Sequence, residues 1–357
     1  MDGSAKSLKD RRYKVGILGC GGIAQVHVWA LNAIKGVELK AFCDVDIDKA
    51  KRLFELDREL KKNSGKNAEG YGTPQVEISD DWRSLLDSDL DVIHVCTPHH
   101  LHAPMAKELL CHGKAVFMEK PCAISVEQFG ELQREDEAHP GSLGFCFQNR
   151  YNESTLLMDR IVREGRIGEI RGGRAMVTWR RDEEYYSESL WKGRIATEGG
   201  GALINQSIHT LDLLLRHLGR PYDVKGSIAN HHLKETYIEV EDTVEAWMEF
   251  PGGARACFYA SNAYATDAPV YLELQGTKGR ICINGSEVSV YADGENPMHV
   301  SSDLAPGMGK DYWGRGHLAC IEDFYDCLNG KAVYQNNLKG VENTFLTAMK
   351  IYEMARK

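Results

Sequence analysis

The stretch YKVGILGCGGIA, residues 13–24, decides the fold of the first half of the chain. Its first seven residues form an apolar run typical of a buried strand, and a helix is expected from about residue 23 to residue 34. Glycines between a strand and a helix allow a tight turn and let a pyrophosphate approach the backbone, where the helix N-terminus favours its negative charge. The G-x-G-x-x-A pattern therefore predicts a dinucleotide-binding loop, with these residues at the phosphates: Gly19, Gly21, Gly22, Ile23 and Ala24.

The second apolar run, VELKAFCD (37–44), ends in Asp44. A carboxylate at the end of this strand accepts hydrogen bonds from the adenosine ribose hydroxyls and repels a 2′-phosphate, so it favours NAD over NADP. The following DVDID motif leaves an alternative open, because an aspartate here could instead cap the next helix.

Apolar strands alternate with amphipathic helices as far as residue 150, which predicts a parallel sheet covered on both faces. Beyond Tyr151 the runs are longer and are divided by PGG, GTKG and NGS turns, which are hairpin signals. The fold class is therefore α/β. We expect a disordered extension over 1–12, a Rossmann dinucleotide-binding domain over 13–150, and a substrate and oligomerisation domain over 151–357 with a large, mainly antiparallel open sheet. The last predicted strand of the first domain covers 143–151.

Composition narrows the function classes. The 357 residues suffice for two cores, and a formal charge of −9 argues against a nucleic-acid or membrane partner. Ten cysteines include no CxxC pair, which favours reduced thiols and a cytoplasmic protein. HHLH (99–102) opens a helix without cysteines at metal-ligand spacing, so no metal site is expected.

Ligands of open α/β sheets lie at the carboxyl ends of the strands. Here those ends carry Thr97 and Pro98, then Glu119 and Lys120, then Arg150. A lysine between a buried strand and a proline could have a lowered pKa and carry protons. It could equally form a surface ion pair with Glu119, and the residues alone leave both interpretations open.

The stretch GGGALINQSIHTLDLLLRHLG (199–219) contains two stripes at helical spacing. An apolar seam must be buried, and beside it lie Asn205, His209 and Asp212. The three glycines would allow the backbone to approach a cofactor or substrate closely. A single histidine beside a core seam is more often structural than catalytic.

Four motifs occur in order: G-x-G-x-x-A with its aspartate, CTPxxxH (96–102), EKP (119–121) and GGGxLxxxxxHxxD (199–212). From Tyr13 onwards the chain thereby resembles the Gfo/Idh/MocA oxidoreductases, the glucose–fructose oxidoreductase and inositol dehydrogenase group. The resemblance implies NAD(P)-dependent oxidation of a sugar or cyclitol hydroxyl, and a homo-oligomer (dimer or tetramer) formed through the open sheet. It implies that Lys120 and His209 are catalytic, that a cis bond precedes Pro121, and that the cofactor site also includes Thr97, Pro98, His102, Glu119 and Lys120.

The resulting hypothesis is an NAD-dependent sugar or cyclitol dehydrogenase in which Lys120 and His209 shuttle the hydroxyl proton and Asp212 orients or caps. Many relatives have aspartate where this chain has Asn205, and asparagine cannot accept a proton, so we assign it a positioning role. Asparagine-glutamine at 205–206 resembles a sub-group that includes nucleotide-sugar and glycoside 3-dehydrogenases. Candidate substrate contacts, which could instead be core residues, are Arg150, Trp179, Tyr186, Trp191, Asn205, His209 and His317.

Two other classes compete with this hypothesis. The first is a glycosidase that uses bound NAD transiently, which the GGGALINQSIH block disfavours. The second is a non-catalytic NAD-binding regulator of the same fold, against which the presence of Lys120 and His209 argues.

Overall fold

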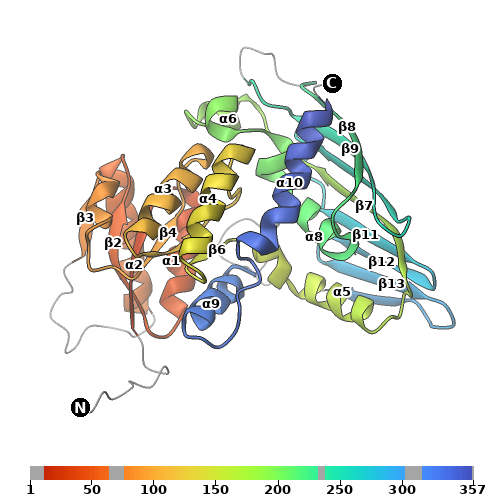
Figure 1. The fold of residues 1–357 in the computed structure, drawn as a ribbon, viewed down its shortest axis with the longest axis horizontal. Coiled ribbons are helices and arrows are strands. Elements are labelled where there is room, and N and C mark those ends of the chain that lie inside the picture. Colours follow the sequence, from red (N-terminus) through yellow and green to blue (C-terminus); the bar gives the residue numbers. More distant parts are fainter. Residues whose placement is uncertain (1–11, 64–75, 232–237, 302–315, 356–357) are drawn as a thin grey trace. The chain divides into compact units, whose positions relative to one another are not determined.

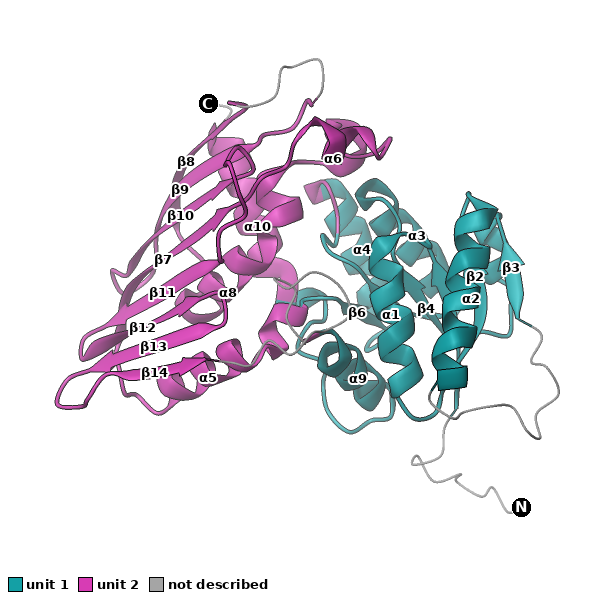
Figure 2. Cartoon of the chain, turned by 180° about the vertical axis from the view of Figure 1, so that it is seen from behind, with its two compact units in different colours: residues 1–122, 127–147, 317–340 teal, residues 123–126, 148–316, 341–357 magenta. Residues whose placement is uncertain are grey.

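The computed structural model describes residues 12–63, 76–231, 238–301 and 316–355. It divides into two compact units (Figure 2). Unit 1 comprises residues 1–122, 127–147 and 317–340, and unit 2 comprises residues 123–126, 148–316 and 341–357. The chain thus returns to unit 1 after completing the sheet of unit 2. The expected N-terminal extension lies, apart from Arg12, outside the described residues.

Unit 1 is built on a six-stranded sheet in the order β3-β2-β1-β4-β5-β6, and every pair of neighbours is parallel. The strand order reverses between β1 and β4, as in dinucleotide-binding folds. This confirms the predicted Rossmann sheet. Its strands are β1 (Tyr13–Leu18), β2 (Val37–Cys43), β3 (Glu77–Ser79), β4 (Val92–Val95), β5 (Ala115–Met118) and β6 (Leu143–Phe145).

Helices alternate with these strands along the chain (Figure 1). The helix after β1 packs on β2 and on the helix that follows β2, and the helix after β4 packs on β4 and β5. Their buried residues include the apolar positions that predicted them. The helices of unit 1 are α1 (Gly22–Ala33), α2 (Ile47–Asn63), η2 (Trp82–Leu85), α3 (His99–Cys111), α4 (Val126–Ala138) and α9 (Gly316–Leu328), where α4 and α9 each begin one residue before the unit does.

The strand predicted over 143–151 is shorter than expected. It ends at Phe145, and a 3-10 turn, η3 (Gln148–Tyr151), follows. The N–H of Phe147 donates to the carbonyl of Phe145 at 3.1 Å, which is incompatible with continued extended pairing. The prediction was wrong here because the apolar run continues past the point where the backbone turns.

Unit 2 contains an eight-stranded sheet in the order β14-β13-β12-β11-β7-β10-β9-β8. Among the described pairings of this sheet, only the β7–β10 pair is parallel, so the predicted, mainly antiparallel sheet is confirmed. Its strands are β7 (Ile170–Thr178), β8 (Asp223–Ala229), β9 (Thr243–Glu249), β10 (Arg255–Ser261), β11 (Tyr271–Gly276), β12 (Gly279–Asn284), β13 (Glu287–Ala292) and β14 (Met298–Ser301).

One face of this sheet is covered by helices, with α8 against β7 and β11, and α5 against β12 and β13. The stretch 199–219 is not one continuous α-helix. A π-helical turn, η4, precedes α8, and the side chains of its apolar seam are buried. The helices of unit 2 are α5 (Glu153–Arg163), α6 (Glu183–Ser187), α7 (Ile195–Glu198), η4 (Ala202–Gln206), α8 (Ile208–Leu218) and α10 (Leu338–Ala355), which is in unit 2 from residue 341.

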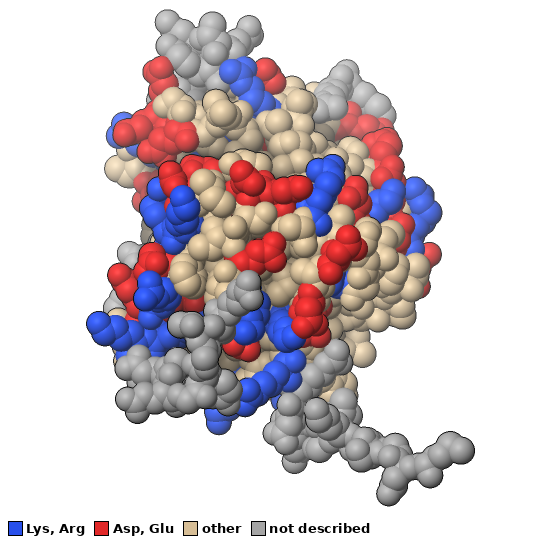
Figure 3. Space-filling model, turned by 90° about the vertical axis from the view of Figure 1, so that its left-hand side faces the viewer, with Lys and Arg blue, Asp and Glu red and all other residues tan. Residues whose placement is uncertain are grey.

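All ten cysteines lie in the described part of the chain and carry free thiols. None of the described helices combines the length and apolar character needed to cross a bilayer. On the face drawn in Figure 3, acidic and basic side chains are interspersed.

Candidate active-site residues in the two units

The phosphate loop has the geometry that the glycine pattern predicts. Gly19 has φ +88°, and a Cβ there would lie 2.6 Å from the carbonyl oxygen of Cys96. A Cβ at Gly21 or Gly22 would meet nothing within 4 Å, so this side of the loop is open. Because α1 begins at Gly22, the loop presents helix N–H groups to this open space. The backbone therefore fits a pyrophosphate.

Asp44 is held by the same loop. Its Oδ2 accepts from the backbone N–H of Cys20 at 2.7 Å, and its Oδ1 accepts from that of Asp46 at 2.9 Å. The carboxylate is half-buried at the end of β2. It lies at the position predicted for a ribose-binding group. Its bonds are to the loop rather than to α2, where Oδ1 of Asp46 accepts from the backbone N–H of Asp48 at 3.2 Å.

The ends of β4 and β5 are joined by His102, which is buried in α3. Its Nδ1 lies 2.8 Å from the carbonyl oxygen of Pro121, and its Nε2 lies 2.8 Å from that of Thr97. The Thr97 hydroxyl is buried and has no hydrogen-bond partner among the described residues. A buried hydroxyl in that state is suited to a bound ligand. Together with the open glycine loop, it makes this edge of the sheet a site that fits the predicted dinucleotide.

Lys120 follows β5, is half-buried, and precedes a cis peptide bond to Pro121. The neighbouring Glu119 is only 7% exposed, so the two residues do not form a surface ion pair. Glu119 Oε2 accepts from the backbone N–H of Lys120 at 3.3 Å, and Oε1 lies 3.0 Å from Nε2 of His27. Burial opposes ionisation of Glu119, but the hydrogen bond and charge of His27, with the charge of Lys120, hold its pKa well below the usual glutamate range.

A chain of buried side chains continues from Glu119. His27 Nδ1 lies 2.8 Å from His94 Nδ1, and His94 Nε2 lies 3.0 Å from the hydroxyl of Tyr325. Burial, reinforced by the charge of His27, keeps the pKa of His94 well below its ordinary value. With Glu119 ionised and His27 charged, every bond is satisfied when His27 donates to the carboxylate and to His94, and His94 donates to the hydroxyl of Tyr325. No motif in the sequence indicates this chain of side chains.

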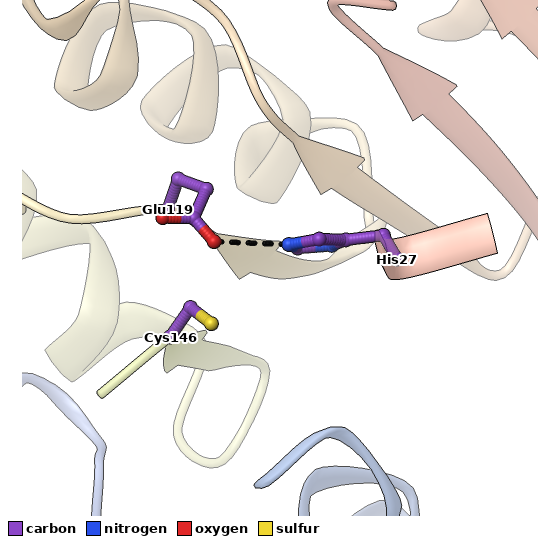
Figure 4. A group of neighbouring side chains, drawn as sticks. All are labelled: His27, Glu119 and Cys146. Carbon is purple, nitrogen blue, oxygen red and sulfur yellow. Dashed lines mark hydrogen bonds and ion pairs between the residues drawn. The ribbon is translucent and has the colours of Figure 1, made fainter. Parts of the chain in front are cut away.

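Two of these residues, with the buried thiol of Cys146, lie close enough together to share one cation. Ligand atoms of His27, Glu119 and Cys146 all lie within 4.8 Å of one another (Figure 4). Burial raises the pKa of the Cys146 thiol well above its usual value, and hydrogen bonding with Cys320 and Glu119 adds to this. A protonated thiol and a carboxylate already bonded to His27 form a hydrogen-bonded cluster rather than a set of ligands awaiting a metal.

His317, a candidate substrate contact, lies in unit 1 on the first turn of α9 and is 3% exposed. Burial lowers its pKa to about 4, although the charge of Glu119 acts in the opposite direction. It therefore belongs electrostatically to the Glu119 cluster and is neutral near pH 7.

In unit 2, Asn205 lies in η4 and His209 lies in the first turn of α8. Asn205 Nδ2 donates to Oε1 of Glu198 at 2.5 Å. Glu198 is fully buried and is not among the site residues predicted from the sequence. The only sequence signal was a glutamate directly before the three glycines.

Asp212 does not serve as a capping group at the surface. It is 1% exposed and accepts from Nε and Nη2 of Arg150, at 2.7 and 2.5 Å, and from the hydroxyl of Thr344 at 2.7 Å. Arg150, a candidate substrate contact, is thereby committed to an internal ion pair.

The three glycines approach the protein's own atoms. A Cβ at Gly199, Gly200 or Gly201 would lie 2.5 Å or less from an atom of another residue of unit 2. Those residues are Ile124, Tyr352 and Glu241. The predicted close approach is correct, but in the described structure its partner is the chain itself.

The aromatic candidates differ in exposure. Trp179 and Tyr186 are 6% and 4% exposed, whereas Trp191 is half-buried. Tyr186 accepts from Nδ2 of Asn262, which also donates to Oε1 of Gln206, at 3.2 and 3.1 Å. Trp179 and Tyr186 are thus buried inside unit 2, as expected if they are core residues.

Comparison with known proteins is consistent with this division. Residues 13–143 match the model of an oxidoreductase family with an NAD-binding Rossmann fold, and residues 155–282 match the GFO/IDH/MocA C-terminal domain. An uncharacterised oxidoreductase, YrbE of Bacillus subtilis, is 26% identical over 317 residues, covering 87% of this chain and 82% of the relative. A glycosyl hydrolase family 109 protein of Shewanella baltica is 30% identical over 198 residues, but these cover 53% of this chain and only 41% of the relative.

Solved structures show the same fold over nearly the whole chain. WlbA dehydrogenase from Bordetella pertussis, in complex with NADH and UDP-GlcNAcA, has a TM-score of 0.78 at 22% identity, with 97% of each chain covered. Levoglucosan dehydrogenase in complex with NADH has a TM-score of 0.81 at 21% identity, with the same coverage. With both family models matched in order, this chain belongs to the Gfo/Idh/MocA family of NAD-dependent oxidoreductases, and its unit 1 is the NAD-binding Rossmann domain.

Proposed function

We propose that this protein oxidises a secondary hydroxyl of a sugar, a sugar derivative or a cyclitol with NAD as the cofactor. The observation that carries the proposal is the edge of the unit 1 sheet. There β5 delivers Glu119 and Lys120 beside the end of β4, on the same parallel sheet as the phosphate loop. A dinucleotide bound at that loop would lie at the carboxyl ends of the strands, which is where Lys120 lies.

The sugar class is supported by the relatives. WlbA was solved with a nucleotide sugar, UDP-GlcNAcA, and levoglucosan dehydrogenase is named for an anhydrosugar. The resemblance of Asn205–Gln206 to the sub-group of nucleotide-sugar and glycoside 3-dehydrogenases points the same way. A pyranose hydroxyl is therefore favoured over that of a simple polyol.

The reaction removes a hydride and a proton from the H–C–O–H unit of the substrate, and bound NAD supplies the acceptor for the hydride. We assign the proton to His209, because histidine, with an unperturbed pKa of about 6.5, is the residue type suited to proton transfer close to neutral pH. Lys120 stabilises negative charge developing on the oxygen and shares in the proton transfer. Asn205 positions the hydroxyl, and Trp191 contributes to the substrate wall.

The test is a panel of sugars, glycosides, nucleotide sugars and cyclitols with NAD or NADP, followed through the absorbance of the reduced cofactor. K120A and H209A should each lose on the order of 100-fold in turnover while still binding NAD. K107A, which removes an exposed lysine of α3 paired with Glu131, is the matched control and should retain activity. Full turnover in either K120A or H209A would refute the assignment.

A second candidate is an NAD-dependent glycosidase, favoured by the similarity to glycosyl hydrolase family 109 proteins. Such an enzyme would release the aglycone of a nitrophenyl glycoside without net formation of NADH. That product, in the absence of cofactor reduction on any free sugar, would replace the dehydrogenase proposal.

We also propose that the chain forms a homo-oligomer through the sheet of unit 2. The register places Met176, Cys257 and Trp247 on one face, because residues opposite each other or two apart in a strand share a face. All three are exposed, Met176 by 41% and Trp247 by 43%, whereas α8 packs on this sheet. Sedimentation equilibrium of the wild type and W247K tests this, and a wild-type monomer would refute it.

A further inference from the structure

The buried carboxylate of Glu198 lies directly behind Asn205. Glu198 ends α7 and has no exposed surface. Its Oε1 accepts from Nδ2 of Asn205, and its Oε2 accepts from the backbone N–H of Gly193, each at 2.5 Å. A buried ionised carboxylate needs such donors, and both oxygens have one.

The backbone between the two residues is fixed. Gly199 has φ +83°, and a Cβ at Gly201 would lie 2.0 Å from the carbonyl oxygen of Glu241. The π-helical turn that follows carries Asn205, and single π turns are frequent at functional sites. The chain therefore brings residues 198 and 205 together through a tightly packed glycine turn, which leaves little freedom in their separation.

We propose that Glu198 is the positioning residue of the active site, and that its ionised carboxylate orients the Asn205 amide so that Oδ1 is presented as the acceptor for the substrate hydroxyl. An ionised carboxylate can only accept, so the nitrogen end of the amide must face it. The oxygen then lies at the opposite end of the amide group. Protonated Glu198 can donate instead, and the amide is then free to reverse. The inference rests on the proposed function, which places Asn205 at the substrate.

The surroundings make this carboxylate titratable near neutral pH. Burial raises the pKa of Glu198 to about 7, against the lowering effect of its bonds to Asn205 and Gly193. The charge of Glu241 raises this pKa further, and the charge of Lys192 lowers it. The other titratable neighbours are Tyr186 and Tyr352, and burial raises the pKa of both, so they stay protonated.

Glu198, which does not touch the reacting atoms, thereby affects substrate binding through Asn205. Above neutral pH the ionised carboxylate fixes the Asn205 amide with Oδ1 presented to the substrate, which we call the lock. Below neutral pH the protonated group no longer fixes this orientation. Because histidine side chains ordinarily titrate in the same region, a proton-accepting His209 should add a second group to the acidic limb of activity, one group acting on proton transfer and the other on KM. Replacing Glu198 by glutamine removes its ionisation, so that only the group acting on proton transfer should remain in the acidic limb.

The first experiment needs no substrate. The side-chain NH₂ signals of Asn205 are identified in [15N]asparagine-labelled protein as those lost in N205D, and are followed from pH 5 to pH 9. We expect a shift with a midpoint near pH 7 in the wild type and in E239Q, an exposed glutamate of the same unit, and no such step in E198Q. A flat wild-type titration, or the same step in E198Q, refutes the inference whatever the substrate is.

The second experiment exchanges the two groups. E198Q should raise KM about tenfold at pH 8 with a smaller change in kcat, because the amide loses its orientation. N205D places two carboxylates within hydrogen-bond distance, so one of them must hold a proton and the acidic limb moves to higher pH. In E198Q/N205D the new amide donates to the new carboxylate, and KM should return to within about threefold of the wild type.

The possible outcomes test the proposed function and the role of Glu198 separately. No turnover by the wild type on any compound of the panel refutes the proposed function, while the amide titration still decides the role of Glu198. Turnover lost in K120A and H209A but with an unchanged KM and pH profile in E198Q refutes the role of Glu198 alone. Failure of the double variant to recover, with its fold intact by circular dichroism, refutes the reciprocal orientation.

Discussion

Replacing Glu198 by glutamine should remove a pH-dependent loss of stability from unit 2. The carboxylate titrates at a pKa of about 7 in the folded protein, against 4.5 for an ordinary glutamate. Between these values the folded state binds more protons than the unfolded state, so the free energy of unfolding falls as the pH rises from about 5 to about 8. Glutamine has no ionisation in this range and lacks the slope.

The size of the effect follows from the shift. A displacement from 4.5 to about 7, at roughly 1.4 kcal/mol for each pKa unit, corresponds to about 3 kcal/mol between the acidic and alkaline plateaus. The substitution also alters the hydrogen bonds to Asn205 and Gly193, which adds an offset, but this offset does not depend on pH. The contribution of Glu241, whose pKa burial also raises, is common to both proteins and largely cancels in the difference.

The assay is urea unfolding of wild type, E198Q and the exposed control E239Q, from pH 5 to pH 9, followed by circular dichroism. E198Q should gain about 3 kcal/mol relative to the wild type between the two ends of this range. E239Q should follow the wild type without such a gain, since Glu239 is exposed and paired with Arg194. Parallel curves for wild type and E198Q would show that Glu198 titrates as an ordinary glutamate, and would remove the basis for the proposed lock.

Three further outcomes follow from individual contacts. In D44S, kcat/KM for NADP should rise relative to NAD by tenfold or more, since a carboxylate that repels a 2′-phosphate is lost; an unchanged ratio would refute our interpretation of Asp44. R150M should lower the free energy of urea unfolding by about 3–5 kcal/mol, because Asp212 is left buried and unpaired, and a loss below about 1 kcal/mol would contradict that pairing. G200A should lower the melting temperature because a Cβ there would lie 2.0 Å from the hydroxyl of Tyr352, whereas G200A/Y352F should recover part of the loss.

Most of the fold could be predicted from local patterns in the sequence. The phosphate loop, the alternation of strands and helices, and the turn signals of the second sheet each reflect contacts within a few residues or a simple periodicity. The boundaries failed where the backbone turned inside an apolar run, as after Phe145, and where a π turn interrupted the apparent helix before His209. Apolar content is the same on both sides of such points, so periodicity has no signal for them.

A different reason explains why the buried residues that contact the proposed site residues could not be predicted. His27, His94 and Tyr325 lie far apart in the sequence and meet only after the sheet forms and α9 packs. In a sequence, a buried histidine looks the same whether it is structural or part of a hydrogen-bonded chain. Arg150 shows a related difficulty, since its residue type favours an anionic partner and the sequence does not reveal that the fold supplies Asp212 as one.

Each unit places a buried glutamate behind a residue that we assign to the chemistry, and the two environments drive the pKa values apart. Glu119, beside Lys120, is bonded to His27, whose hydrogen bond and charge outweigh burial and keep the carboxylate ionised across the physiological range. Glu198, behind Asn205, accepts from the neutral amide of Asn205 and the backbone N–H of Gly193, and burial outweighs these bonds and raises its pKa to about 7.

Titratable groups separated in this way take different roles in catalysis. The permanently charged Glu119 provides a constant electric field at Lys120, whereas Glu198 changes its charge near neutral pH. The pH response of substrate binding should therefore be located in unit 2 and that of cofactor binding should be weak. Measuring the Kd for NADH between pH 6 and pH 8 in wild type and E198Q tests this division, and a pH dependence of Kd that disappears in E198Q would contradict it.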